Sequence, residues 1–128
     1  MKPLAMMFCA VLAFTAMLTT PAQAHHGWAA FNHDKTVSFK GKVTVFRFLN
    51  PHSVVEFDTI DEAGKTVNWQ GELTSASRLG TKGWVASSLN KGDEINIVGY
   101  PAKSGVPTMR ISKLTLADGK QMTIVMDN

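Results

Sequence analysis

The segment TVSFKGKVTVFRF, residues 36–48, carries the strongest structural signal in the chain. Apolar and polar side chains alternate from Val37 onward, which predicts a long β-strand with one apolar face. Gly41 stands on that face where a side chain is expected, and after Val45 the apolar positions change phase, so that Phe46 takes over. A glycine and a phase change within one strand predict a strongly bent or bulged strand.

Alternating apolar positions continue on the C-terminal side of this segment, with one interruption where the spacing becomes helical. The turn sequences Asp61-Glu62-Ala63-Gly64 and Asp118-Gly119 separate neighbouring strands, and Gly92 follows the helical stretch as a stop signal. The predicted elements are strands over 55–58, 67–73, 93–100, 109–116 and 122–126, and helical segments over 75–79 and 84–89.

Three strands, a helix, and two or more strands follow one another in the order of an OB-type barrel. The bent first strand favours this fold, because that strand must serve both sheets of a small closed barrel. We therefore expect an all-β fold with one short helix: a small OB-like barrel of five to six strands, with the helix between strands 3 and 4. The single domain would cover residues 25–128, and a plain β-sandwich with one incidental helix is the alternative.

Residues 1–24 have the organisation of a signal peptide. Lys2 gives a short positive start, and residues 4–18 form an apolar run of roughly 15 residues, shorter than the roughly 18 of a spanning helix. Pro21 breaks any helix, and the sequence Ala-Gln-Ala ending at Ala24 offers the small residues that signal peptidase accepts. We expect cleavage after Ala24 and a periplasmic or secreted product without membrane insertion; a retained anchor is the alternative.

The composition, charge and motifs of the chain limit the classes of function that it can have. The only cysteine, Cys9, lies in the expected leader, so the mature domain has no disulfide and relies on its core. The net charge of +3 comes from scattered lysines without a basic stripe, which argues against nucleic-acid binding. Glu56 and Asp58 share the polar face of a strand, and no phosphate loop, zinc spacing or nucleotide fingerprint is present. We expect a binding protein and not an enzyme.

Cleavage after Ala24 would leave His25 as the first residue, followed by His26. A free terminal amine and the imidazole of the same residue form one chelate ring, and Cu(II) heads the affinity order for such nitrogen sites, with Zn(II) below it. His52, presented by an Asn-Pro turn, would add a third nitrogen if the N-terminal segment folds back. The sequence therefore predicts a copper site at His25, His26 and His52; a solvated terminus and a turn histidine bonded to a carbonyl are the alternative.

A second hypothesis uses the ligand face of OB folds, which bind on strands 2 and 3 and on the loops joining strands 1–2 and 4–5. Here those loops are residues 49–52 and 101–107, expected on one side of the barrel. The protein would then be an accessory domain that binds a protein partner or a small organic ligand through Asn50, His52 and Lys103. A copper oxidase, which needs a metal site and redox turnover as well, is a third and weaker hypothesis.

The aromatic residues are assigned mainly to structure. Trp69 falls on the apolar side of the third strand and Trp84 on the helical face that caps the barrel, so both are expected in the core. Trp28 is expected to hold the N-terminal segment against the domain, and His33 to lie in an exposed turn.

Seven short segments together resemble one protein family. They read AHHGWAAF (24–31), NPHS (50–53), NWQGEL (68–73), GW (83–84), LNKGDEI (89–95), GYPA (99–102) and LADG (116–119). This succession resembles the DUF6152 family of small exported bacterial proteins and spans the whole mature chain. The resemblance implies export and one compact domain. That family has no assigned activity, so the resemblance supplies no catalytic residues.

Overall fold

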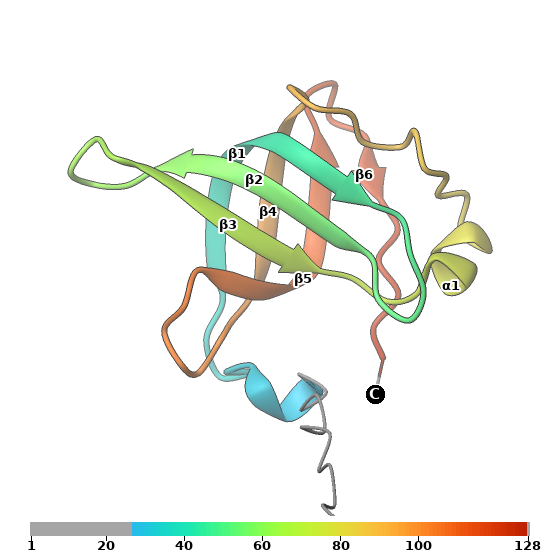
Figure 1. Ribbon diagram of the computed structural model, residues 1–128, viewed down its shortest axis with the longest axis horizontal. Helices are drawn as coiled ribbons and strands as arrows, with labels where there is room; N and C mark the ends of the chain where they lie inside the picture. The colour runs from blue at the N-terminus through green and yellow to red at the C-terminus, as the bar shows by residue number, and fades with distance from the viewer. Residues whose placement is uncertain (1–26, 128) are drawn as a thin grey trace, which may run out of the picture.

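The bend predicted in the first strand organises the fold. In the computed structural model, which describes residues 27–127, strand β1 (Val37–Arg47) pairs with β4 along its first half and with β2 along its second half (Figure 1). The register with β2 shifts between Val43 and Val45, as at a β-bulge. Beyond the shift Val45 is exposed while Phe46 packs against the core, so the predicted change of phase is confirmed.

Five strands close into a barrel and a sixth lies outside it. The sheet order is β3-β2-β1-β4-β5-β6, and a parallel pairing of β3 with β5 closes the barrel. The OB-like barrel is therefore confirmed, and the plain sandwich is excluded. The remaining elements are the 3-10 helix η1 (Trp28–Ala30), β2 (Val54–Ile60), β3 (Thr66–Glu72), α1 (Ala76–Gly80), β4 (Glu94–Pro101), β5 (Thr108–Leu116) and β6 (Gln121–Met122).

Gly41 on β1 leaves space inside the barrel for an aromatic ring of the neighbouring strand. A Cβ atom at this position would lie 2.5 Å from Cδ2 of Phe57 on the neighbouring strand. The Phe57 ring, which is fully buried, therefore packs directly over the β1 backbone. The glycine that interrupts the apolar face is a packing requirement of this barrel.

The core contains Trp84, as predicted, and Trp69 lies at its margin. Trp84 is 1% exposed and belongs to the central cluster of buried side chains. Trp69 is half-buried on β3, where its ring centroid lies 4.6 Å from that of Phe39. The helix α1 begins at the side chain of Ser75, which accepts a hydrogen bond from the Arg78 amide, a standard N-cap arrangement.

The prediction of a second helical segment over 84–89 is wrong. These residues form turns, because Gly83 adopts φ +88°, which does not continue a helix. The Ser88 hydroxyl then accepts a hydrogen bond from the Val85 amide at 2.8 Å, and this local bond competes with helix formation. Trp84 and Leu89 still reach the core from this irregular segment.

The sixth strand is shorter than predicted. β6 contains only Gln121–Met122, and residues 123–127, which we call the tail, leave the sheet and run toward the N-terminal end of the described chain (Figure 1). The carbonyl of Thr123 accepts a hydrogen bond from Nε1 of Trp84 at 2.8 Å, so the tail turns over the core instead of pairing with β5.

The predictions for the leader fall outside the structure. The expected signal peptide, residues 1–24, and the histidines His25 and His26 lie outside the described residues. Over residues 27–127, the helices are too short or too polar to span a lipid bilayer.

Candidate functional site

The N-terminal arm, which we define as residues 27–35, is fixed against the barrel. Phe31 is buried and forms a β-bridge with Ala102 in the loop between β4 and β5. The amide of Lys103 in the same loop donates to the carbonyl of Ala30 at 3.0 Å. Backbone contacts of this kind fix the path of the arm, so its first described residue has a defined place on the barrel.

An aromatic stack reinforces the arm. The rings of Trp28 and His33 are stacked with centroids 3.7 Å apart, and the edge of Trp28 faces Tyr100 on β4 at 5.9 Å. Nε2 of His33 donates to the Trp28 carbonyl at 2.7 Å. Trp28 therefore contacts the domain as predicted, although it is 42% exposed and the buried anchor is Phe31. The predicted turn at His33 is present, but this side chain is half-buried and not exposed.

A small cleft lies between the arm and the barrel wall. Its volume is about 130 Å³, and its lining residues are Gly27, Trp28, Phe31, His52, Glu72, Arg110 and Asp127. The start of the arm and the loop between β1 and β2 thus meet at one site. His25 and His26 directly precede Gly27 in the sequence. The length of the backbone therefore keeps the Cα atoms of both within about 7 Å of the Gly27 Cα atom.

The His52 ring turns one nitrogen toward the barrel wall. Nδ1 lies 3.4 Å from the carbonyl oxygen of Leu73 and 3.5 Å from Oε1 of Glu72, both long for a hydrogen bond. None of the hydrogen bonds found among residues 27–127 uses Nε2 of His52. The ring is therefore oriented through Nδ1, and Nε2 is the atom available to a ligand.

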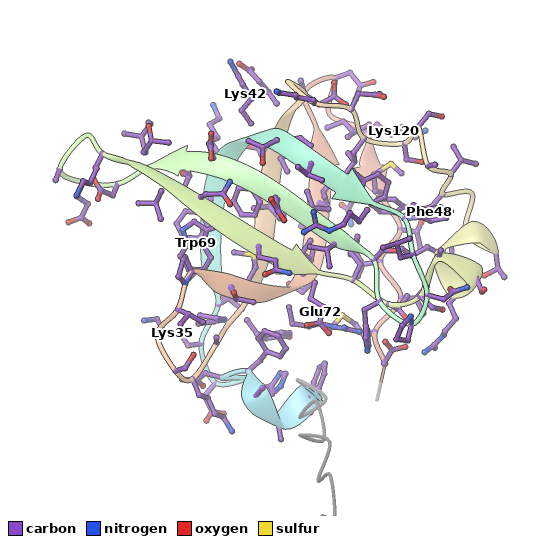
Figure 2. The ribbon with its side chains drawn as sticks, viewed as in Figure 1. Lys35, Lys42, Phe48, Trp69, Glu72 and Lys120 are labelled. Atoms are coloured by element: carbon purple, nitrogen blue, oxygen red, sulfur yellow. The ribbon has the colours of Figure 1, made fainter. Side chains whose placement is uncertain are left out.

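A partly buried ion-pair network forms the wall of the cleft next to His52. Its member Glu72 is labelled in Figure 2. The Arg110 side chain is only 5% exposed, and its guanidinium contacts Oε1 of Glu72 at 3.1 Å and Oδ2 of Asp127 at 2.6 Å. Burial lowers the pKa of Arg110, whereas the charge and hydrogen bond of Glu72 raise it and the charge of Arg78 lowers it further. The pairing of β3 with β5 sets Glu72 opposite Arg110.

The three residues predicted for organic ligands do not share one cavity. His52 lines the cleft, whereas Asn50 and Lys103 line neither this cleft nor a larger groove that crosses β1. Oδ1 of Asn50 accepts hydrogen bonds from the amide and hydroxyl of Ser77, at 3.0 and 3.2 Å, and so holds the first turn of α1. Lys103 is exposed, and its backbone holds the arm.

The described part of the chain holds no complete metal site. Across residues 27–127, no three His, Cys, Asp or Glu side chains are grouped so that they could hold a metal ion. His52 and Glu72 are two groups of the required chemistry that line the cleft together.

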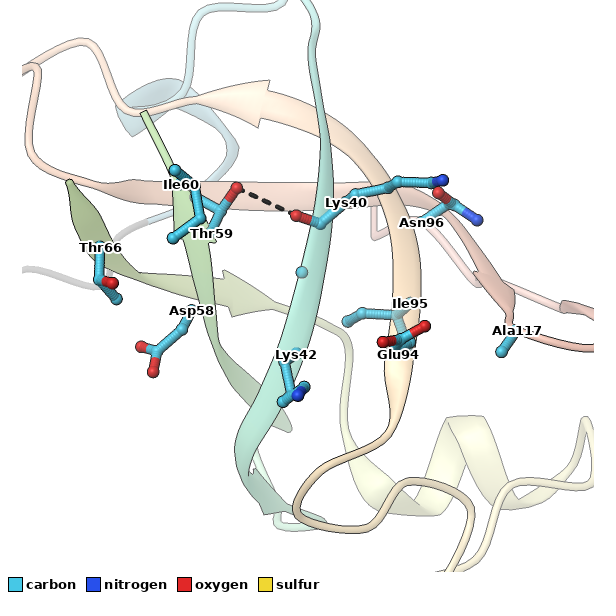
Figure 3. A pocket seen from close by; sticks show the side chains of 11 residues that line it. Lys40, Lys42, Asp58, Thr59, Ile60, Thr66, Glu94, Ile95, Asn96 and Ala117 are labelled. Atoms are coloured by element: carbon cyan, nitrogen blue, oxygen red, sulfur yellow. Dashed lines mark hydrogen bonds between the residues drawn. The ribbon is translucent and has the colours of Figure 1, made fainter. Parts of the chain in front are cut away.

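A larger groove of about 610 Å³ was not predicted from the sequence. It crosses β1 where this strand pairs with both β2 and β4 (Figure 3). Its lining residues are Lys40, Gly41, Lys42, Asp58, Thr59, Ile60, Thr66, Glu94, Ile95, Asn96 and Ala117. The Lys40 side chain points toward Asn96 on β4, and the Lys40 carbonyl accepts from the Thr59 hydroxyl at 3.0 Å.

Sequence reasoning also missed Arg110 and Asp127. The one available signal was the position of Arg110 between two apolar residues, Met109 and Ile111, in a predicted strand. Such a pattern indicates an outward-facing arginine and gives no sign that other segments cover it.

Comparison with known proteins places the chain in one family. The DUF6152 family model, described as a family of unknown function, matches residues 13–110. A comparison with curated proteins finds no match. The family match covers most of the barrel and agrees with the resemblance of the seven short segments. The chain therefore belongs to the DUF6152 family, whose function is unknown.

Proposed function

We propose that this protein is exported, is cleaved after Ala24, and then binds a transition metal, copper in preference to zinc. The ligands are the terminal amine and ring of His25, the ring of His26, and Nε2 of His52. The observation that carries the proposal is the cleft shared by Gly27 and His52, because it brings the start of the arm beside the third proposed ligand.

The chemistry of the three ligands suits copper. A terminal amine and imidazole rings are neutral nitrogen donors, for which Cu(II) has the highest affinity among the divalent first-row metals. The contacts of Nδ1 with the Leu73 carbonyl and the Glu72 carboxylate resemble the outer contacts that orient metal-binding histidines. His33 is already engaged with Trp28 and is not included in the site.

We propose binding or handling of the metal and not catalysis. The tethered ligands account for metal capture alone, and turnover as a copper oxidase would require a bound substrate and an electron source in addition. The proposed location is the periplasm or the exterior of the cell, where the terminal amine produced by cleavage is available.

The larger groove favours a second candidate function. Its volume of about 610 Å³ falls in the range of roughly 300–1,000 Å³ typical of small-molecule sites. Because Asp58 and Thr66 belong to β2 and β3, the groove lies partly on the strands expected to bind a small organic ligand or a protein partner. The groove and the cleft share no lining residue, so loss of His52 should leave groove binding unchanged.

The first test measures Cu(II) affinity of the protein beginning at His25 by competition with a chromophoric chelator. We compare it with a form carrying an added Gly-Pro before His25. Proline removes the backbone N–H that would let the new terminus chelate copper through its own amides. We expect the extension to weaken binding by roughly a hundredfold and His52→Ala by roughly tenfold, which is about 2.8 and 1.4 kcal/mol.

A histidine outside the proposed site provides the matched control. His33→Phe keeps a ring stacked on Trp28 but removes both nitrogens, so Cu(II) affinity should not change. Equal affinity of the extended and unextended proteins would rule out the amine chelate, and an unchanged affinity of His52→Ala would remove His52 from the site.

A further inference from the structure

The Asp127 carboxylate at the end of the tail is held by donors from three parts of the barrel. Oδ2 lies 2.6 Å from Nη2 of Arg110 on β5. Oδ1 accepts a hydrogen bond from the Thr74 hydroxyl at 2.7 Å and also contacts Nη1 of Arg78 on α1. One carboxylate is thus bound by two guanidinium groups and one hydroxyl, the charge-assisted contacts typical of carboxylate recognition.

The donors belong to rigid elements, whereas the carboxylate belongs to an irregular one. Arg110 is fixed by burial on β5 and by its contact with Glu72, and Thr74 is buried. The tail has no regular secondary structure, and no backbone–backbone hydrogen bond found within residues 27–127 involves residues 123–127. The binding groups are therefore preformed, and the carboxylate that they bind belongs to a segment that is not held by backbone hydrogen bonds.

The cleft extends this site toward the arm. Asp127 lines the cleft together with Trp28, Phe31 and His52, so an apolar space of about 130 Å³ lies beside the carboxylate. A small acid whose carboxylate replaced that of Asp127 would have room for a short apolar body against these rings.

We propose that Arg78, Thr74 and Arg110 form a binding site for small monocarboxylic acids that Asp127 occupies in cis. The tail acts as an intramolecular competitor, whose effective concentration is in the millimolar range. Free acids bind when the tail lifts, and they bind more readily when Asp127 cannot compete. This site uses no metal, and its carboxylate-binding groups differ from the proposed copper ligands, although the cleft beside it is also lined by His52.

The test is chemical rescue of Asp127→Asn, followed by thermal unfolding with a chelator present. The variant should lose about 5 °C in melting temperature, because Arg110 loses a carboxylate partner. Sodium acetate should restore the melting temperature of the variant along a saturating concentration curve, while sodium chloride at equal ionic strength should not. Propanoate and benzoate should act at lower concentrations than acetate, because the cleft accepts their apolar bodies.

Asp118→Asn is the matched control. Asp118 lies in an exposed turn and accepts a hydrogen bond from the Lys120 amide at 2.8 Å, without an arginine partner. Acetate should not restore this variant. Adding Arg78→Ala to Asp127→Asn should abolish the rescue, and rescue that persists in the double variant, or that chloride matches, overturns the proposal.

A titration of the unaltered protein keeps the proposal testable if Asp127→Asn does not fold. Acetate should shift the NMR signals of the Asp127 amide and the Trp28 indole together, with one saturation curve. Saturating acetate that leaves both signals unmoved overturns the proposal. Because the chelator excludes metal from every sample, failure here leaves the copper proposal standing, and failure of copper binding leaves this site standing.

Discussion

Replacing Trp84 with alanine is expected to lower the free energy of unfolding by about 4 kcal/mol. The side chain is 1% exposed, so its removal leaves a cavity in the centre of the core cluster. It also removes the packing against Phe46, at a centroid distance of 5.9 Å, and the hydrogen bond from Nε1 to the Thr123 carbonyl. Urea unfolding followed by far-UV circular dichroism measures the change.

Two further variants separate the contributions to this loss. Trp84→Phe keeps most of the ring volume but loses the hydrogen bond to Thr123, so it should cost about 2 kcal/mol. Trp28→Ala makes the same truncation at an exposed position and should cost about 1 kcal/mol through the lost stack on His33. If Trp84→Ala is no more damaging than Trp28→Ala, Trp84 does not belong to the core.

Gly99→Ala is expected to lower the free energy of unfolding by about 3 kcal/mol. A Cβ atom at Gly99 would lie 2.4 Å from the carbonyl oxygen of Arg110 and 2.9 Å from Sδ of Met109. The carbonyl belongs to the backbone of β5, at the place where the β4–β5 register shifts, so it cannot move without disturbing the pairing.

Gly80→Ala provides the control for this prediction. Gly80 ends α1, and a Cβ atom there would meet nothing within 4 Å. Alanine has the higher helix propensity, so this variant should be neutral or more stable by up to about 1 kcal/mol. Urea unfolding of both variants gives the comparison, and equal destabilisation would show that the close approach at Gly99 is not the cause.

The barrel was predictable because its signals are local. The phase change after Val45 and the interruption at Gly41 are both visible in residues 36–48, and each matches a feature of β1. The order of strands and helix then selects the OB-like arrangement, and the β3–β5 closure follows from it.

The segment 84–89 was mispredicted because the same spacing fits two structures. Trp84 and Leu89 are buried in either case, so their apolar character does not distinguish a helix from turns. The distinction comes from Gly83, which adopts positive φ, and from Ser88, whose hydroxyl binds a nearby amide. The backbone conformation of one residue and the side-chain hydrogen bond of another thus decide the structure of a short segment whose apolar spacing fits both alternatives.

The candidate site was only partly predictable. His52 was identified from the Asn-Pro turn, and the condition that the N-terminal segment folds back toward it could be stated but not resolved. The structure places Gly27 and Trp28 in the same cleft as His52, whereas His25 and His26 lie outside the described residues. The covering of Arg110 by the arm and the tail arises from irregular segments, for which the sequence has no periodic signal.

The proposed metal site includes a new N-terminus at His25, and one measurement tests it directly. The full chain, including residues 1–24, is expressed in a bacterial host and recovered after export, and its intact mass is measured under native conditions after exposure to Cu(II). We predict a chain that begins at His25 and carries one copper ion. A chain that begins at His25 but carries no copper, or one that begins at another residue, contradicts the account.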